Sequence, residues 1–582
     1  MGNRIGKSED LGLMPPITHS SSLREVSPTI TPTWGIVWVG VFVLVLFSIY
    51  ATTMPISFPP GVEDVKWSRW AEGGEWVLEE RRLLAAPMEK IWFRGWQWLG
   101  YEGKAFIPLQ LLHCLLGAIG AGCIVWLLRS KGASAFVALA TGLIIGLGPA
   151  WFGNARVAYC HLTNVVFGLL AVAIVLTSPV ATLRHGRVLG IIVGLLVGFS
   201  ALLQLNGLGF LLAVLLAIFV RLGCSFVERA TKVCSAAAVA LSVIGLSYVV
   251  AWNCYVPVEQ HPAGFVAWLR AHPELGVMGT GGVSSRNMLR AGAGLLTAIG
   301  GSDGVTEYAK SRIFGQPGEV ALGAGDWVAT VCALAALLVT ALGTVKCCSF
   351  RNTRTEGYAG VAVVLVYGAS AVLWLGSDIW LWLGPVAMLW FLAGIAATHL
   401  SGRRPAIEVL FALALLLSCI GAYRQVEAPS LSGNRASPSV ESAIAYSRIA
   451  TSADLLVAFH GGWPSWLNYA YGDRVAYLYQ LSFGKDWKAR LENQFEATSY
   501  GGRIFVAEDV VHPQDVDDLE TWDIVAKQNE MSRSSVLAVL GKYGALEPVE
   551  FPGSSEKLWQ LRVKRAAQFS AMVFGKSRET KR

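Results

Sequence analysis

The chain has 582 residues, of which 54% are apolar and only 15% are charged. An ordinary soluble protein carries about 25% charged residues, and a single soluble core stops growing at about 250–300 residues. The composition therefore excludes a disordered chain, a nucleic-acid-binding arm and a plain cytosolic enzyme, and it predicts an integral membrane protein.

The net charge of +7 comes from 47 basic and 40 acidic side chains. From Arg424 onward the two signs balance, with 19 of each, so the basic surplus lies in the apolar part of the chain. There it indicates membrane topology and argues against a nucleic-acid partner. All ten cysteines lie between Cys114 and Cys419, mostly in apolar stretches, which argues against a disulfide framework.

Eleven apolar stretches follow a polar N-terminal tail, and each is long enough, or nearly so, to cross a bilayer, which takes about 20 residues. They cover residues 34–54, 105–128, 136–151, 157–176, 188–203, 208–220, 233–252, 327–345, 360–375, 379–398 and 407–422. The sequence therefore predicts a polytopic α-helical membrane protein with about 11 transmembrane helices.

Basic residues gather in alternate short loops, for example Arg129 with Lys131 and Arg403 with Arg404. The positive-inside rule places these loops, and with them the tail 1–33, in the cytoplasm. The membrane module then spans 34–423 and has two large outer loops, 55–104 and 254–326. The lack of cysteine after Cys419 and of a targeting signal favours a bacterial inner membrane.

The segment 424–582 differs in composition from the membrane module. It predicts an α/β domain with a flexible C-terminal tail, and the orientation given above places this domain on the outer, periplasmic side. It opens on a linker rich in proline, serine and glycine, 427–439. Short apolar runs at 455–459, 475–478, 504–506 and 558–563 are typical of strands, and amphipathic stretches at 487–496, 516–528 and 534–543 are typical of helices.

The first outer loop concentrates groups suited to chemistry at a membrane surface. Glu63 and Asp64 are adjacent carboxylates, and they precede Lys66 and Arg69, which alternate with Trp67 and Trp70. A carboxylate there can act as a base or hold a metal, and basic groups bind phosphate. An amphipathic helix is expected along the interface over 79–98. The plain alternative is an ordinary interfacial tryptophan belt.

Further polar residues stand at the outer ends of predicted spans. Arg156 is the basic residue in a short outer turn, against the positive-inside bias, so an anionic partner is expected; the alternative is snorkelling to headgroups. His161 and Asn164 follow one turn apart, and His113 lies within the second span. We expect them to line a substrate cavity, and the alternative is packing. Asp378 binds polar substrate or caps the next helix.

Two other regions carry weaker signals. The loop 254–326 contains Arg286, Asn287 and Arg290 beside a glycine-rich run, and it either forms a lid or is a solvated loop. His512 with the acidic residues that follow it lacks a metal-binding register. No phosphate-binding Walker loop, serine-hydrolase elbow or zinc-protease motif is present.

This layout resembles the GT-C superfamily of polytopic membrane glycosyltransferases, which includes protein O-mannosyltransferases and aminoarabinose transferases. The resemblance covers 34–563. It rests on one span, an outer loop with the acidic pair Glu63-Asp64, interface helices, many spans and an outer α/β domain whose start, 452–474, is also similar. Arg156 with His161 lies where many members keep a basic and an acidic residue, although no acid accompanies them here.

The resemblance implies inverting transfer of a sugar from a polyprenyl-phosphate-linked donor to a glycan, lipid or protein acceptor on the outer face. Asp64, or alternatively Glu63, would deprotonate the acceptor, and Arg156, Arg69 or Lys66 would stabilise the leaving lipid phosphate. Members differ in metal use, so the cofactor stays unknown and a divalent cation stays open.

Two alternative functions, from classes other than glycosyltransferases, remain. A flippase for lipid-linked sugars predicts charged groups inside spans, whereas the spans here are nearly free of them. A non-catalytic assembly protein predicts that Asp64 and Arg156 are dispensable.

Overall fold

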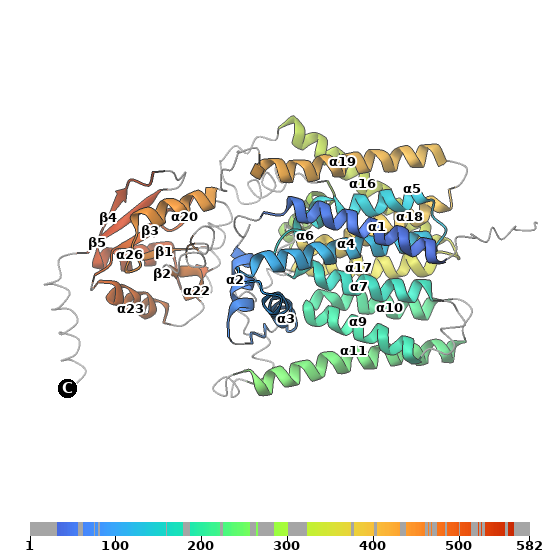
Figure 1. The fold of residues 1–582 in the computed structure, drawn as a ribbon, viewed down its shortest axis with the longest axis horizontal. Helices are drawn as coiled ribbons and strands as arrows, with labels where there is room; N and C mark the ends of the chain where they lie inside the picture. Colours follow the sequence, from blue (N-terminus) through green and yellow to red (C-terminus); the bar gives the residue numbers. More distant parts are fainter. Residues whose placement is uncertain are drawn as a thin grey trace, which may run out of the picture.

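The computed structural model describes residues 32–55, 62–74, 76–79, 82–158, 160–178, 187–221, 225–256, 264–265, 284–300, 323–373, 378–400, 404–430, 438–459, 464, 467, 474–482, 486–499, 501–513, 522, 525–526, 530–552 and 557–563. These residues form a bundle of long, roughly parallel helices with a smaller sheet domain at one end (Figure 1). The first-loop helices α2 and α3 lie at that same end.

The bundle contains seven segments that are long and apolar enough to cross a membrane among the residues described. They are α1 (Pro32–Thr53), α4 (Phe106–Ser130), α11 (Phe226–Cys254), α16 (Ala324–Ser349), α17 (Arg354–Leu373), η3 (Ile379–Trp382) continued by α18 (Leu383–Thr398), and α19 (Arg404–Ser430). The predicted polytopic helical fold is confirmed.

Four shorter elements complete the set of apolar helices. The pair α5 (Ala135–Gly146) and α6 (Pro149–Ala155) is bent by 64°, because Pro149 at the start of α6 cannot continue the preceding helix. The others are α7 (His161–Thr177), α9 (Arg187–Leu203) and α10 (Leu208–Val220), the last preceded by η1 (Leu205–Gly207). Every predicted stretch coincides with one of these helices, while the number of crossings stays a prediction.

Helix α4 lies in the core of the bundle, with 72% of its apolar window buried, compared with 89% for η3–α18 and 17% for α1, α11, α16 and α19. It packs on α1, α5, α6 and α7. Glycines permit this close approach: a Cβ at Gly120 would lie 2.7 Å from Trp151. At Gly168 of α7 it would lie 2.2 Å from Phe210 of α10. Small residues are the usual means of bringing membrane helices together.

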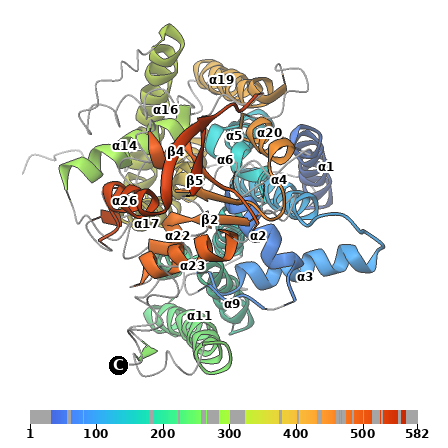
Figure 2. The same cartoon turned by 90° about the vertical axis from the view of Figure 1, so that its left-hand side faces the viewer.

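The first outer loop folds into two helices, α2 (Val62–Glu72) and α3 (Ala85–Trp98), which pack on each other and on α4. The expected helix over 79–98 is wrong in its first part. Arg82 N–H donates to the Glu79 carbonyl and Leu84 N–H donates to the Leu202 carbonyl of α9, so the described residues 79 and 82–84 are not helical and are fixed to the bundle. In Figure 2 the far end of α3 projects beyond the bundle.

The second outer loop contributes a helix, α14 (Ser285–Gly300), to the bundle. It packs against α6, α16, α17 and η3, so this part of the expected solvated loop is an integral element. Its amphipathic sequence explains the packing, since the apolar residues recur at helical spacing. The rest of 257–322, apart from 264–265 and 284, lies outside the described residues.

The outer domain is a five-stranded sheet in the order β2-β1-β3-β5-β4, drawn in front of the bundle in Figure 2. Its strands are β1 (Leu455–Ala458), β2 (Arg474–Tyr477), β3 (Ile504–Ala507), β4 (Gly544–Val549) and β5 (Leu558–Val563). The first three are parallel, and β5 is antiparallel to both β3 and β4. Four of the five strands match predicted runs; β4 was not predicted.

Several helices among the described residues accompany the sheet or lead into it. They include α20 (Pro438–Ile449), α22 (Leu478–Ser482), α23 (Trp487–Ser499), α24 (Glu508–Val511) and α26 (Arg533–Tyr543), while α19 continues to Ser430 and so covers the start of the expected linker. The predicted helix 516–528 lies largely outside the described residues. Asp454 accepts hydrogen bonds from Arg503 through Nη2 at 2.8 Å and backbone N–H at 2.6 Å, which joins the starts of β1 and β3.

Candidate functional site

The basic and aromatic residues of α2 form the first part of the site. Lys66 Nζ lies 3.3 Å from Glu79 Oε1 and 4.7 Å from the centroid of the Trp70 ring. Trp67 is completely buried, and it meets Trp70 edge-on with ring centroids 4.9 Å apart. The cation is therefore held in a fixed place between a carboxylate and an aromatic face.

Glu79 joins two cations. Besides Lys66 it approaches Arg82, whose Nη1 lies 3.7 Å from Glu79 Oε2 and whose guanidinium lies 5.8 Å from the Trp67 ring. The side chains of Glu79 and Arg82 are only 7% and 12% exposed. Two basic groups thus share one carboxylate at the end of the bundle that faces the sheet domain, an arrangement suited to an anionic ligand.

His161, at the start of α7, lies against this group. Its ring stacks on Trp380 of η3 with centroids 4.0 Å apart and planes 2° apart, and its Nδ1 lies 3.3 Å from Gln204 Oε1. It interacts electrostatically with Arg82 and Glu79. The structure therefore brings together the predicted residues Lys66, Trp67, Trp70 and His161, which are far apart in the sequence.

A second, fully buried polar pair lies beneath α3. His113 Nε2 of α4 is 3.3 Å from Glu89 Oε1 of α3, and the two side chains are 0% and 1% exposed. His113 Nδ1 lies 3.4 Å from the hydroxyl of Thr163 on α7. The histidine thus connects the interface helix to two helices of the bundle, as a hydrogen-bonded packing residue does.

Arg156, just after α6, is buried and engaged with backbone carbonyls. Its Nη1 donates to the Thr53 carbonyl of α1 at 2.8 Å and its Nε donates to the Phe152 carbonyl at 3.2 Å. The guanidinium lies 4.0 Å from the Phe152 ring, and Gln110 donates to the Arg156 carbonyl. These contacts connect the end of α1 to α6. The Arg156 side chain therefore binds backbone carbonyls of the protein and does not extend to lipid headgroups.

Asn164 lies among the bundle helices. Its side-chain amide donates to the Tyr367 hydroxyl of α17 at 3.0 Å, and its backbone carbonyl accepts from the Ser200 hydroxyl of α9. Asp378 occupies the N-cap position of η3, where its side chain makes no capping hydrogen bond. Arg69 is half-buried on α2.

The two candidate catalytic carboxylates belong to the first turn of α2. The backbone at Glu63 and Asp64 is helical, and their side chains lie outside the described residues. Within the part of the chain that the structure describes, no cluster of three histidine, cysteine, aspartate or glutamate side chains is arranged to hold a metal ion.

Sequence reasoning missed several residues of this site. Glu79 and Arg82 were assigned to a helix, and Glu89, Gln204 and Trp380 gave no motif. One signal was available for Glu89, which shares the buried face of α3 with Ala86 and Phe93 at helical spacing; a carboxylate on such a face needs a partner.

Helix α14 adds further polar side chains at the outer end of the bundle. Asn287 and Arg290 are only 8% and 7% exposed, on a helix that packs against η3 and α6. The long-loop residues considered for a lid therefore include two that are built into the bundle next to the helix that carries Trp380.

Together these elements define a polytopic α-helical membrane protein with a sheet domain at one end of its helix bundle. Among solved structures the chain is similar to ArnT from Cupriavidus metallidurans bound to undecaprenyl phosphate, with a TM-score of 0.55 and 13% identity over 91% of this chain and 99% of that one. ArnT in the apo state gives 0.42 at 15% identity, over 91% and 98% of the two chains. At such identities the likeness establishes the fold.

A more distant likeness is to the S. cerevisiae protein O-mannosyltransferase Pmt1-Pmt2 complex bound to the sugar donor. Its TM-score is 0.32 at 14% identity, over 39% of this chain and 34% of that one. No family model and no curated protein sequence matches the chain.

Proposed function

We propose that this protein is a membrane glycosyltransferase that transfers a sugar from a polyprenyl-phosphate donor to an acceptor at the outer face, with inversion. The observation that carries the proposal is the group Lys66, Glu79, Arg82 and His161, in which Glu79 and His161 are buried and the two cations half-buried beside aromatic rings. The fold supports it, because ArnT, which shares the architecture, has been solved with undecaprenyl phosphate bound.

Lys66 and Arg82 are the groups that we assign to the lipid phosphate. Glu79 holds both in place before substrate arrives, so little reorganisation is needed when negative charge develops on the leaving phosphate. Arg156 is a weaker choice than the sequence indicated, because two carbonyls already occupy its guanidinium. Arg290 and Arg69 stay as further basic groups near the site.

Asp64 is the proposed base, with Glu63 as the alternative. Position 64 lies three and four residues before Trp67 and Ser68, which are both completely buried, and such positions share one face of a helix. The carboxylate would take the proton of the acceptor hydroxyl as its oxygen attacks the anomeric carbon. The bond from that carbon to the phosphate oxygen breaks, and the electron pair leaves with the lipid phosphate.

The membrane sidedness belongs to the same proposal. Positive residues in alternate loops place the site, the outer domain and the acceptor on the periplasmic face of a bacterial inner membrane. The acceptor class, whether glycan, lipid or protein, and a divalent cation stay open, and no step above depends on a metal.

The first experiment separates binding from transfer. Polyprenyl phosphate is added to the purified protein in nanodiscs, and bound ligand is counted by native mass spectrometry. Arg82→Ala should weaken binding at least tenfold, as loss of a charge-assisted phosphate contact predicts. Arg94→Ala is the matched control, because Arg94 is exposed on α3. Equal affinity in both variants would contradict the assignment.

The second experiment follows release of polyprenyl phosphate from a labelled polyprenyl-phosphate sugar in the presence of host membrane acceptors. Asp64→Asn should abolish release while leaving polyprenyl-phosphate binding intact, and Glu102→Gln, at an exposed position of the same loop, should change neither. Full transfer by Asp64→Asn would reject Asp64 as the base. Donor binding without transfer by the unaltered protein would favour a flippase.

A further inference from the structure

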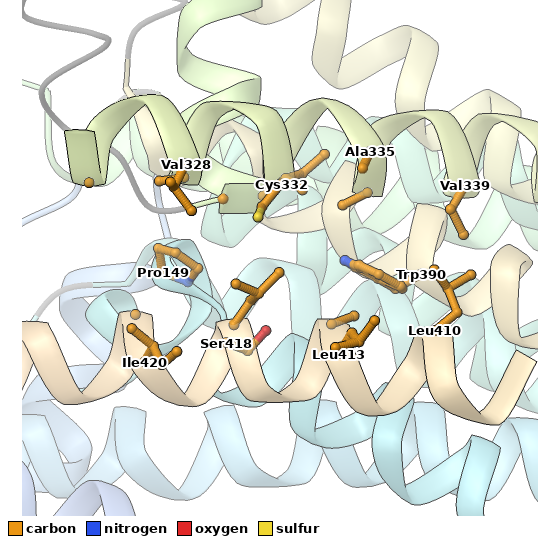
Figure 3. A pocket seen from close by; sticks show the side chains of 18 residues that line it. Pro149, Val328, Cys332, Ala335, Val339, Trp390, Leu410, Leu413, Ser418 and Ile420 are labelled. Carbon is orange, nitrogen blue, oxygen red and sulfur yellow. The ribbon is translucent and has the colours of Figure 1, made fainter. Parts of the chain in front are cut away.

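A cavity of about 550 Å³ lies between α16 and α19, inside the membrane part of the bundle (Figure 3). Its walls come from α16 and α19, and its back is formed by Trp390 of α18, Pro149 of α6 and Ile299 at the end of α14. Of its eighteen lining residues, only Cys332, Ser418 and Trp390 carry a polar side-chain atom. It therefore differs in chemistry from the charged site above.

The cavity opens toward the surrounding bilayer. Helix α16 packs on α14, α17 and α18, whereas α19 packs on α5, α6 and α14, so both walls contact α14, whose residues Ile299 and Gly300 line the cavity. Only 17% of the apolar window of either helix is buried. The lining residues Val328 and Leu413 are 60% and 54% exposed, which makes them contact surfaces for lipid.

The length of the groove matches one membrane leaflet. From Gly325 to Val339 the α16 wall rises about 21 Å, and from Leu410 to Gly421 the α19 wall rises about 17 Å. Half of a bilayer's hydrocarbon core is about 15 Å. The Gly421 end leads toward the outer domain (Figure 1), so the groove runs from the outer surface to slightly beyond the midplane.

We propose that this groove holds one acyl chain of a glycerophospholipid from the outer leaflet as a resident lipid. If an apolar space of this size were empty, the side chains that line it would lose van der Waals contacts. Water would gain no hydrogen-bond partners there. A hydrocarbon chain fills it without either cost. Lys66, Arg82 and His161 do not line the groove, which separates its occupant from the donor.

The resident chain has a structural consequence for α14. Ile299 and Gly300 at the end of that helix form part of the groove wall, and α14 packs on η3, which carries Trp380. The lipid therefore contacts the end of α14, a helix that also packs on η3. This proposal does not depend on the transfer reaction and is tested without it.

The test uses the full-length protein in nanodiscs of phosphatidylethanolamine that contain a trace of phosphatidylglycerol with a diazirine in the middle of one acyl chain. After irradiation, labelled positions are mapped by mass spectrometry. Label should concentrate on lining residues such as Cys332 and Leu413 over the exposed Leu416, which does not line the groove. Even labelling of lining and other exposed positions would overturn the proposal.

A matched pair of variants on α19 sharpens the test. Ala414→Phe fills the groove, because Ala414 lines it, whereas Ala412→Phe adds the same bulk at an exposed position that does not line it. Groove labelling should fall at least fivefold in the first variant and stay unchanged in the second. Equal labelling in the two variants would reject a bound chain.

Competition identifies the occupant even if Ala414→Phe does not fold. Polyprenyl phosphate at a few molar equivalents should leave groove labelling of the unaltered protein unchanged. Loss of label under these conditions would assign the groove to the donor lipid and overturn the proposal of a resident phospholipid.

Discussion

Replacement of Glu89 tests whether the buried Glu89–His113 pair holds the first-loop helices on the bundle. The carboxylate is 1% exposed and 3.3 Å from His113 Nε2, so Glu89→Ala removes a buried acceptor and opens a void under α3. Breaking a buried pair from one side costs about 3–5 kcal/mol. Since the imidazole can change tautomer, we expect the lower end, about 3 kcal/mol.

The measurement is a thermal scan with a thiol-reactive fluorogenic dye in detergent. Cys114 is completely buried next to His113, so its reaction reports opening of this region. A loss of about 3 kcal/mol lowers the apparent Tm by about 2–3 °C, because unfolding entropy is about 2.1 cal/mol/K per residue. Glu89→Gln, which retains an acceptor oxygen, should fall between Glu89→Ala and the unaltered protein.

Glu102→Ala is the control, because Glu102 is exposed in the same loop. If Glu89→Ala and Glu102→Ala unfold at the same temperature, the pair does not hold α3 in place, and the reasoning from its burial is refuted.

Three further predictions concern other parts of the molecule. Gly168→Val should sharply reduce the yield of monodisperse protein on size-exclusion chromatography, because a Cβ there meets Phe210 at 2.2 Å, whereas Gly245→Ala, with open space around it, should not. His161→Asn should slow polyprenyl-phosphate release severalfold at unchanged expression, because the stack on Trp380 is lost; an unchanged rate would remove His161 from the site. Burial raises the pKa of Asp454, but hydrogen bonds from the Arg503 side chain and backbone outweigh burial and hold that pKa below its ordinary value. The ionised Asp454 carboxylate therefore stabilises the folded protein above the unfolded-state pKa of about 3.9. This stabilisation is lost as the pH falls through the pKa of Asp454 in the folded protein, so the Tm difference between the unaltered protein and Asp454→Asn should shrink below about pH 4.

The sequence predicted the membrane bundle well because hydrophobic runs are a local property. Each apolar stretch became a helix, and the strands 455–458 and 558–563 were visible as short apolar runs. Strand β4 was not predicted because its sequence, Gly544 to Val549, contains a proline and a glutamate. It lies at the edge of the sheet and pairs with β5. An edge strand of this kind has no apolar run to reveal it.

The site was harder to predict because its residues meet only through tertiary packing. His161 and Trp380 are 219 positions apart, and nothing local indicates that their rings stack. Glu79 looked like one more charge at the start of a helix, although it holds Lys66 and Arg82. Composition indicated one end of the molecule as the candidate site, while the partners of each charge needed the fold.

The hydrogen bond from Leu84 N–H to the Leu202 carbonyl bears on how this protein can be re-engineered. It ties the turn that carries Arg82 to the end of α9, two residues before Gln204, which contacts His161. The first loop is therefore not an exchangeable module. A chimera that imports a loop from a protein with another specificity should import the α9–η1 junction with it, because a backbone hydrogen bond joins the two segments and both interact with His161.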